Sequence, residues 1–254
     1  MRYSRIALHG RPVFGEVADG LVHVLDGDPI AGRVKRTGDH VPLNGVDLLP
    51  PVIPPVFYAV GFNYRSHLEH FRKSAPARPE VGYRANNALI GHGSPIIRPA
   101  GVAGRFEAEG EVVAVIGRRL KKATRQEAQE SIFGWTIGND VSAREWQHAD
   151  RTFWRSKNSD TFKPMGPWIE TGVDPFAQTT TVRIDGAERA RFATGDMIFD
   201  PYDYIVETTR HITMHPGDVL WMGADSTVQL EPGTTVDIEI SGIGALSNPV
   251  LEES

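Results

Sequence analysis

The sequence predicts a mainly β, α+β fold: one large domain preceded by a small β region. Glycine and proline account for 26 and 18 of the 254 residues, which indicates many turns. Short apolar runs bounded by turn residues recur along the chain, and after residue 165 nearly all of them have strand patterns. The length is ample for a substantial hydrophobic core.

Residues 1–50 are expected to form a small N-terminal β domain. Asp19-Gly20 has the chemistry of a hairpin turn, and short strands are predicted at 5–8, 12–17 and 21–25. Five prolines between residues 42 and 55 then indicate a linker. We therefore expect the second, catalytic domain to comprise residues 51–254.

The first half of this larger domain alternates strands with short helices. A buried strand is predicted at 56–60, a short helix at 64–72 and a loop at 76–100. Residues 112–116 are a continuous apolar run of β-formers, so a buried strand is predicted there.

A second helix is predicted from its start signal. Thr124 and Glu127 have the spacing of a capping box, and Ala128, Ile132 and Phe133 would give the helix a partly apolar face. Gly134 is expected to end this helix, and a strand follows at 135–137.

The last third of the chain is predicted to be almost entirely β. Asp185-Gly186 is a turn signal between two strands, and further strands are expected from their apolar patterns. These predicted strands lie at 181–184, 190–192, 219–222 and 235–240.

Composition excludes several classes of function. The net charge of −5 argues against a nucleic-acid partner, which would favour a basic face. The absence of cysteine excludes disulfides, thiolate metal sites and a cysteine nucleophile. The N-terminus lacks the apolar run of a secretory signal, and no run is long enough to cross a membrane. We therefore expect a soluble, cytoplasmic protein with no membrane partner.

Three alternating carboxylates precede the apolar strand at 112–116. On one strand, Glu107, Glu109 and Glu111 would all point to the same face and crowd three negative charges together. A divalent cation with oxygen ligands is the simplest neutralising partner. The alternative is a solvated edge strand whose glutamates face water.

Other candidate residues each have an ordinary structural interpretation. Asp140 is either a metal ligand or part of a strand-end turn, and His67 is either a proton acceptor or a structural histidine. Lys157 lies in a polar loop, where a solvated lysine is the usual interpretation. Arg144 and Gln147 are three residues apart and could share a helix face that presents donors to a carboxylate, or form a surface pair.

Five segments resemble, in the same order, motifs of the fumarylacetoacetate hydrolase family. They are VGFNYRSH at 60–67, EGEVVAVIG at 109–117, GNDVSAR at 138–144 with Gln147, KNSDTFKPMGP at 157–167, and MHPGDVL at 214–220 with ISGIGALSN at 240–248. Each motif is moderately specific, and the ordered set, which covers about residues 56–250, is strongly specific.

The resemblance implies a fold, a metal and roles for individual residues. The fold would be a mixed β-sandwich or β-roll around a metal site, usually in a homodimer. Glu109, Glu111 and Asp140 would hold Mg²⁺ or Mn²⁺, and Lys157 would stabilise negative charge on the substrate beside the metal. The resemblance also implies a substrate site lined by Tyr64, Arg144 and Gln147.

Two departures from the family pattern concern water activation and substrate contact. Many relatives continue H-x-x-E after the histidine, but this chain reads His67-Leu68-Glu69-His70, so the glutamate is displaced by one residue. On a helix this shift rotates the side chain by about 100°. Either Glu69 or His70 could still assist His67. Ala224 stands where relatives often have a threonine that contacts substrate.

The resemblance implies a small-molecule substrate with a 2-oxo acid or 1,3-diketone unit. The first hypothesis is a Mg²⁺-dependent hydrolase that cleaves a C–C bond, with His67 as the base that activates water. A decarboxylase or isomerase of a related 2-oxo acid is the alternative, and a non-catalytic metabolite-binding protein is a third. Trp146, Phe153 and Trp154 could line an apolar substrate tail, although core packing is the expected role of these aromatic residues.

Overall fold

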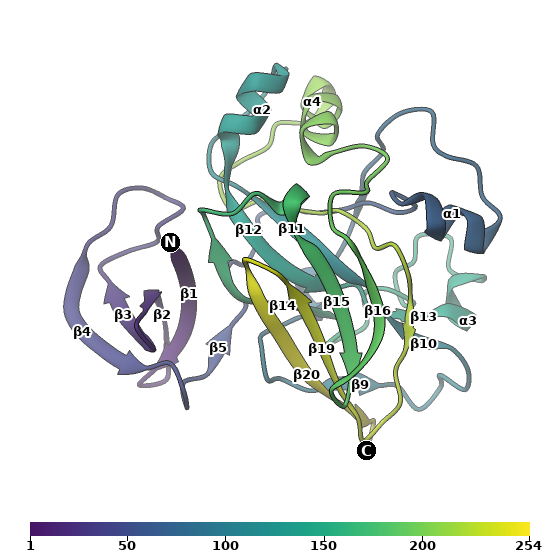
Figure 1. The fold of residues 1–254 in the computed structure, drawn as a ribbon, viewed down its shortest axis with the longest axis horizontal. Coiled ribbons are helices and arrows are strands. Elements are labelled where there is room, and N and C mark those ends of the chain that lie inside the picture. The colour runs from purple at the N-terminus through teal and green to yellow at the C-terminus, as the bar shows by residue number, and fades with distance from the viewer.

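Strands dominate the computed structural model, which describes all residues from 1 to 254 (Figure 1). The first half contains β1 (Arg2–Leu8), β2 (Arg11–Ala18), β3 (Leu21–Leu25), β4 (Arg36–Pro42), β5 (Leu48–Leu49), β6 (Phe57–Ala59), α1 (Arg65–Phe71), β7 (Gly82–Tyr83), the 3₁₀ helix η1 (Asn86–Ala88), β8 (Leu89–Ile90), β9 (Ile96–Arg98), β10 (Phe106–Ala108) and β11 (Gly110–Ile116). The second half contains α2 (Arg125–Ser131), β12 (Ile132–Asn139), β13 (Ser142–Ala143), α3 (Arg144–Gln147), β14 (Lys163–Glu170), η2 (Pro175–Ala177), β15 (Thr179–Ile184), β16 (Ala187–Ala193), α4 (Pro201–His211), β17 (Val219–Trp221), β18 (Val228–Gln229), β19 (Thr235–Ile240) and β20 (Gly244–Glu252). The predicted mainly β fold is confirmed.

The strands form three sheets. The largest has 12 strands, with the main order β4-β3-β2-β1-β14-β12-β11-β17-β6-β7. A five-stranded sheet has the order β16-β15-β19-β20-β9, and a short three-stranded sheet has the order β13-β10-β18. Sheets with one apolar face must bury that face against another layer, and here the five-stranded sheet covers the middle of the large one.

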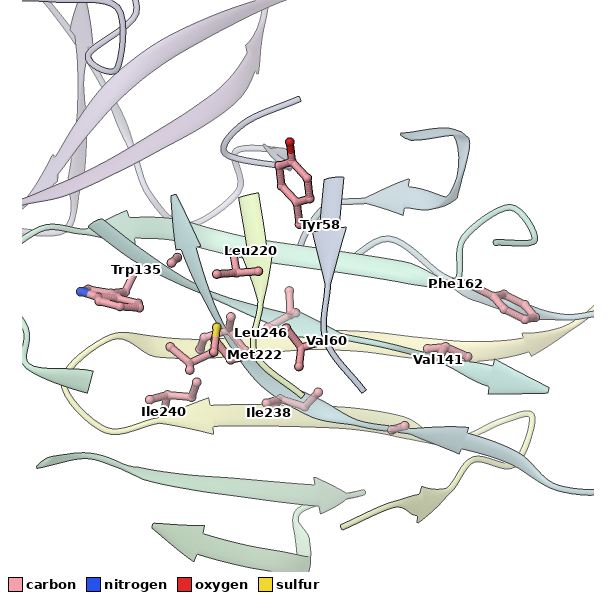
Figure 2. Close-up of a cluster of buried hydrophobic side chains, with 14 of the residues drawn as sticks. Tyr58, Val60, Trp135, Val141, Phe162, Leu220, Met222, Ile238, Ile240 and Leu246 are labelled. Carbon is pink, nitrogen blue, oxygen red and sulfur yellow. The ribbon is translucent and has the colours of Figure 1, made fainter. Parts of the chain in front are cut away.

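The main core lies between these two layers. Figure 2 shows Leu220, Met222 and Ile238 gathered between the strands, and all three side chains are fully or almost fully buried. Val112 and Ala114 contribute to this core from β11, while Val113 and Val115 point to a second buried cluster on the other face. Because both faces of β11 are buried, its sequence is continuously apolar, as the run at 112–116 predicted.

The N-terminal strands extend the large sheet. Strand β1 pairs with β14 through Arg2 opposite Glu170 and Tyr3 opposite Ile169. The meander of β1 to β4 lies to one side in Figure 1, while α1 and α3 lie on the opposite side. A separate small cluster that includes Ile6, Val22 and Leu48 forms its core.

Two helix predictions need correction. The capping box of Thr124 and Glu127 is present, but α2 ends at Ser131, so Ile132 and Phe133 belong to β12 and not to a helical face. Helix α4 was missed in a region predicted to be almost entirely β. Its start signal is Asp200, whose carboxylate accepts a hydrogen bond from the backbone N–H of Asp203, with Pro201 in the first turn.

Only short elements occupy the predicted loop at 76–100, namely β7, η1, β8 and β9. No helix of the structure has the length and apolar character that a bilayer-spanning segment requires.

Candidate active site

The antiparallel pairing of β11 and β12 brings three buried carboxylates together. Gly110 lies opposite Asn139 and Glu111 lies opposite Gly138, so Glu109 and Asp140 emerge side by side at the ends of the two strands. The backbone N–H of Asp140 donates to the carbonyl of Glu109 at 3.0 Å. Glu109, Glu111 and Asp140 each have a carboxylate oxygen within 4.8 Å of the others, and each residue is at most 5% exposed.

Glu107 does not share this position, contrary to the expectation of three glutamates on one face of one strand. Strand β10 ends at Ala108 and β11 begins at Gly110, so the strand is interrupted at Glu109. The carboxylate of Glu107 instead accepts hydrogen bonds from Arg105 at 2.6 Å and from Arg144 Nε at 2.7 Å. The interruption therefore separates Glu107 from the other two glutamates.

Four basic side chains surround two of the three carboxylates. Lys157 Nζ donates to Glu109 Oε2 at 2.6 Å and to Asp140 Oδ2 at 2.5 Å. Arg144 Nη2 donates to Glu109 Oε1 at 2.7 Å. Asp140 also receives two hydrogen bonds from Arg84, and it pairs with Lys163 at 2.8 Å. These contacts neutralise the negative charges of Glu109 and Asp140.

The carboxylates consequently have very different pKa values. Desolvation would raise the pKa of Glu109, but Arg144 and Lys157 outweigh burial and hold it at about 2. Desolvation likewise opposes the ionised form of Asp140, yet Arg84, Lys157 and Lys163 hold its pKa well below the usual value. Burial, together with the charges of Asp140 and Glu109, raises the pKa of Glu111 well above its usual value.

Arg84 and Lys163 were missed by sequence reasoning. Lys163 is fully buried, donates to the carbonyls of Val141 and Phe162, and has its pKa lowered to about 7 by desolvation. The sequence feature that could have identified Lys163 as a site residue was its position in the motif at 157–167. Arg84 had no such signal, because it meets Asp140 from a segment 56 residues away that has no periodicity.

The cluster fits a hard divalent cation. All three donors are carboxylate oxygens, which Mg²⁺ and Mn²⁺ prefer over nitrogen or sulfur. Glu111 has one polar contact in the protein, the backbone N–H of Gly223 at 2.8 Å on Oε2, so its other oxygen is available to a cation. A bound dication would supply the positive charge that the ionised form of Glu111 lacks.

A cavity of about 380 Å³ opens onto the carboxylates. The segment from Ser74 to Arg84 forms one side, and Ala224 lies on the wall. A larger groove of about 930 Å³ lies next to it but contains none of the three carboxylates. The smaller cavity is therefore the candidate active site, because it alone holds the acidic cluster together with basic side chains.

His67 projects into this cavity from α1. The ring stacks on Phe71 with centroids 4.9 Å apart, and its Nε2 lies 3.8 Å from Glu109 Oε1. Its Nδ1 is buried without a hydrogen-bond partner. Desolvation lowers the pKa of His67, with Arg144 and Lys157 adding to the effect, so the ring favours the neutral form.

The remaining residues predicted from the sequence differ in whether they line the cavity. Gln147 lines the cavity, and its Oε1 accepts a hydrogen bond from Arg144 Nη1 at 3.0 Å, so the two share one face of α3. Glu69 and His70 are exposed and do not line the cavity. Tyr64 is buried, and its hydroxyl donates to the carbonyl of Thr194 at 2.7 Å outside the cavity.

Core packing was the wrong expectation for Phe153 and Trp154, whereas Trp146 is half-buried and packs against the main core. Phe153 is 39% exposed and lines the cavity, and Trp154 is 67% exposed on the neighbouring groove. Trp146 also lines the groove, where the guanidinium of Arg155 lies 4.5 Å above its ring.

Comparison with known proteins gives two family matches along the chain. The model described as fumarylacetoacetate (FAA) hydrolase C-terminal matches residues 56–251. The model described as Rv2993c-like, N-terminal matches residues 1–51.

Similar proteins cover nearly the whole chain. Protein Rv2993c of Mycobacterium tuberculosis is 40% identical over 228 residues, which are 87% of this chain and 85% of that protein. Oxaloacetate tautomerase YisK of Bacillus subtilis is 29% identical over 254 residues, covering 92% and 84% of the two chains. The crystal structure of 5-carboxymethyl-2-hydroxymuconate delta-isomerase from Mycobacterium smegmatis superposes over 100% of both chains with a TM-score of 0.90 and 36% identity.

Proposed function

Because this chain belongs to the fumarylacetoacetate hydrolase family, we propose that it is a divalent-metal-dependent enzyme that converts a 2-oxo acid through its enolate. One observation carries this proposal. Three buried carboxylates with the donor chemistry for Mg²⁺ or Mn²⁺ open into a cavity that also contains the ammonium of Lys157 and the guanidinium of Arg144.

Glu109, Glu111 and Asp140 would hold the cation in this proposal. When bound, a divalent ion there supplies Lewis-acid polarisation of the substrate carbonyl. Cavity charge also supports an anionic substrate. Three cations, Arg84, Arg144 and Lys157, line the cavity with four carboxylates, Glu80, Glu109, Glu111 and Asp140, so a bound dication would give the lining a net charge of +1 for an anionic substrate to match.

Lys157 is the residue proposed to stabilise the enolate. Lys157 is 6% exposed and its ammonium is held by Glu109 and Asp140, so it is preorganised where charge would develop. A fixed positive charge in a desolvated site stabilises a developing anion far more than in water. Arg144 and Gln147 would orient the substrate carboxylate from the same face of α3.

His67 is proposed to move the proton. Its ring favours the neutral form, and its Nε2 lies 3.8 Å from Glu109 Oε1 beside the acidic cluster, where it can accept a proton from a substrate carbon or from a water molecule. Glu69 and His70 are exposed, and neither is within hydrogen-bond distance of Nδ1, the other ring nitrogen. The carboxylate that would normally strengthen a histidine base for water attack is therefore not beside it.

Proton transfer or decarboxylation is accordingly the favoured outcome of the enolate chemistry. Both reactions need the electron sink and one proton carrier, and neither needs an activated water. The oxaloacetate tautomerase from Bacillus subtilis and the delta-isomerase from Mycobacterium smegmatis support this choice as similar proteins whose named reactions move a proton.

C–C bond hydrolysis of an acylpyruvate-like or 1,3-diketone substrate is the second candidate. The observation that favours it is the neutral ring of His67 in the cavity, whose Nε2 lies 3.8 Å from Glu109 Oε1 and could deprotonate a water. The two candidates share the metal, Lys157 and Arg144, and differ only in what reacts with His67.

The test is to incubate the protein with Mg²⁺ or Mn²⁺ and a panel of 2-oxo acids, acylpyruvates and oxaloacetate. Enol–keto conversion and solvent deuterium incorporation would be followed by NMR, with separate assays for CO₂ and for carboxylate products. Deuterium exchange or CO₂ release that depends on the metal supports the favoured candidate, while a carboxylate fragment without CO₂ supports hydrolysis.

Two variants sharpen this comparison. Lys157→Ala should reduce turnover of every reactive substrate, since the enolate is common to all reactions. His67→Ala should slow metal-dependent deuterium exchange, which needs the proton carrier, and should reduce hydrolysis more than decarboxylation, because only hydrolysis requires an activated water. Absence of turnover across the panel, with metal and substrate binding retained, would instead indicate a non-catalytic metabolite-binding protein.

A further inference from the structure

Arg84 follows β7 and borders the candidate active site. Its side chain is only 9% exposed, and it lines the cavity that holds the three carboxylates. The backbone N–H of Arg84 donates to the carbonyl of Phe57 at 2.9 Å, so the main chain is fixed against β6. The guanidinium therefore extends into the site from an anchored position.

The guanidinium holds Asp140 by two parallel contacts. Nε donates to Oδ1 at 3.1 Å and Nη2 donates to Oδ2 at 2.9 Å. Its Nη1 donates to the carbonyl of Tyr83 at 3.1 Å, which completes the set of contacts. A planar fork on both oxygens of a carboxylate fixes the plane of that carboxylate, which the single ammonium of a lysine cannot do.

The segment after Arg84 is also fastened to the loop that carries Lys157. The backbone N–H of Ala85 donates to Asn158 Oδ1 at 2.8 Å. Asn87 Nδ2 donates to the carbonyl of Asn158 at 3.1 Å and to Asp160 Oδ1 at 2.7 Å. These bonds set the positions of Arg84 and Lys157, the two cavity cations that both contact Asp140, relative to each other.

We propose that Arg84 is a positioning residue that fixes the orientation of Asp140 for binding a divalent cation. This inference rests on the proposed function, because it takes Asp140 as a metal ligand. Hydrogen-bonded supports of metal ligands contribute strongly to affinity, and their removal typically weakens metal binding about 10- to 100-fold.

The positive charge of Arg84 should weaken metal binding, whereas its two-point contact with Asp140 should strengthen it. These opposite effects on metal affinity allow the proposal to be tested. A cation beside Asp140 repels a dication, so a purely electrostatic role predicts tighter metal binding when the charge is removed. A positioning role predicts weaker binding whenever the two-point contact is lost, whether or not the charge remains. Arg84→Lys keeps the charge and loses the fork, while Arg84→Met loses both.

The experiment measures the dissociation constant for Mn²⁺ by EPR, with no substrate present. We expect about 10-fold or greater weakening in both Arg84→Lys and Arg84→Met. Arg78→Met is the matched control, since Arg78 lies on the same segment with a side chain 71% exposed and paired only with exposed Glu80. Its affinity should equal that of the wild type.

Unchanged affinity in Arg84→Lys, or tighter binding in Arg84→Met, would overturn the positioning role. Asn158→Ala provides a second route if Arg84→Met does not fold, because it leaves every charge in place and loosens the clamp between the two segments. It should weaken Mn²⁺ binding by less than Arg84→Lys, and wild-type affinity in both variants would refute the proposal.

The metal-free melting temperature and the Mn²⁺ affinity of the wild type distinguish a failure of this inference from a folding defect and from a failure of the proposed function. A role in folding alone would lower the metal-free melting temperature without changing the Mn²⁺ affinity of the folded protein, and that result would also contradict the proposal. If the wild type itself does not bind Mn²⁺, the proposed function fails together with this inference. Wild-type binding with unaffected Arg84 variants removes only the inference.

Discussion

Glu111 is the carboxylate whose charge the protein does not neutralise. Its neighbours Glu109 and Asp140 have basic partners at 2.5–2.9 Å, whereas Glu111 accepts one backbone hydrogen bond from Gly223. Burial and the two adjacent carboxylates raise its pKa well above the usual value. The protonated form of Glu111 is therefore favoured when no further cation is present, and its ionised form is the one that a metal would stabilise.

This asymmetry predicts different results for two conservative variants. Glu111→Gln should leave the metal-free free energy of unfolding almost unchanged, because it replaces the favoured protonated form of the acid with a neutral amide of the same shape. Mn²⁺ affinity should nevertheless fall by more than about 100-fold, beyond the loss typical of a group that only supports a ligand. Urea unfolding and EPR measure the two quantities.

Glu109→Gln provides the contrast. Its carboxylate is ionised and paired with Arg144 and Lys157, so its removal leaves Arg144 with only Glu107 and Lys157 with only Asp140 as carboxylate partners. The resulting excess of buried positive charge should destabilise the metal-free protein by about 3 kcal/mol. Equal metal-free stabilities of Glu109→Gln and Glu111→Gln would contradict the assigned charges.

At the scale of elements, the β11–β12 pair depends on close packing behind the acidic cluster. Gly138 lies opposite Glu111, and a Cβ at this position would lie 2.6 Å from the ring of Trp221. Trp221 is fully buried on β17, so it has no open space into which to move. The register that sets the carboxylates therefore requires glycine at 138.

Gly138→Ala should destabilise the protein by about 1–3 kcal/mol through overpacking. Gly27→Ala is the matched control, because the added methyl would lie 3.7 Å from Val34 in ordinary contact. Urea unfolding of both variants measures the difference, and equal stabilities would show that the Trp221 ring adjusts without cost.

The junction of β1 with β14 carries a pH-dependent contact. Glu170 accepts hydrogen bonds from Arg2 Nε at 3.1 Å and from the backbone N–H of Gly172 at 2.9 Å. Desolvation would raise the pKa of Glu170, but the N–H of Gly172, the N-terminal ammonium of Met1 at 3.1 Å and Arg2 together outweigh burial and lower it. A depressed pKa means that the contact stabilises the fold above the unfolded value of 4.5 and that this contribution is lost as the pH falls through the folded value.

We therefore expect Glu170→Gln to lose about 1–2 kcal/mol at pH 7, and to differ less and less from the wild type as the pH falls below 4.5. Urea unfolding across this pH range measures the effect, and amide exchange in residues 2–8 should be faster in the variant at pH 7. A difference in stability that grows toward low pH would have the wrong sign for this contact.

At the scale of the whole molecule, metal binding and folding are linked. The acidic cluster joins β11 to the end of β12, and Gly223 next to β17 contacts Glu111, so a bound cation would hold three strands of the large sheet together. A ligand that binds only the folded state stabilises it by about 2.7 kcal/mol at 100 times its dissociation constant.

Mn²⁺ at that concentration should raise the melting temperature by roughly 5–10 °C for a chain of this size. Differential scanning calorimetry with and without the metal measures the shift, and chelation with EDTA should reverse it. Glu111→Gln should show a much smaller shift, and an equal shift in that variant would place the stabilising metal elsewhere.

Much of the fold followed from the sequence because its signals are local. The apolar run at 112–116, the hairpin turns and the Thr124 capping box depend on residues close together in the chain, and each corresponds to an element of the structure. Helix α4 has an equally local signal in Asp200, Pro201 and Asp203, which was overlooked among strands. The α2–β12 boundary was misjudged because apolar residues fit both a helix face and a buried strand.

The sequence by itself determined the family, the mainly β class and a set of acidic residues suited to a hard cation. Only the tertiary structure decided which charges meet. The register of β11 with β12 brings Glu109 next to Asp140, and the strand interruption at Glu109 separates Glu107 from the acidic cluster. Arg84 contacts Asp140 although the two residues are 56 positions apart in the sequence. The physical reason is that the energy of a buried charge depends on neighbours in space, and long-range strand pairing sets those neighbours.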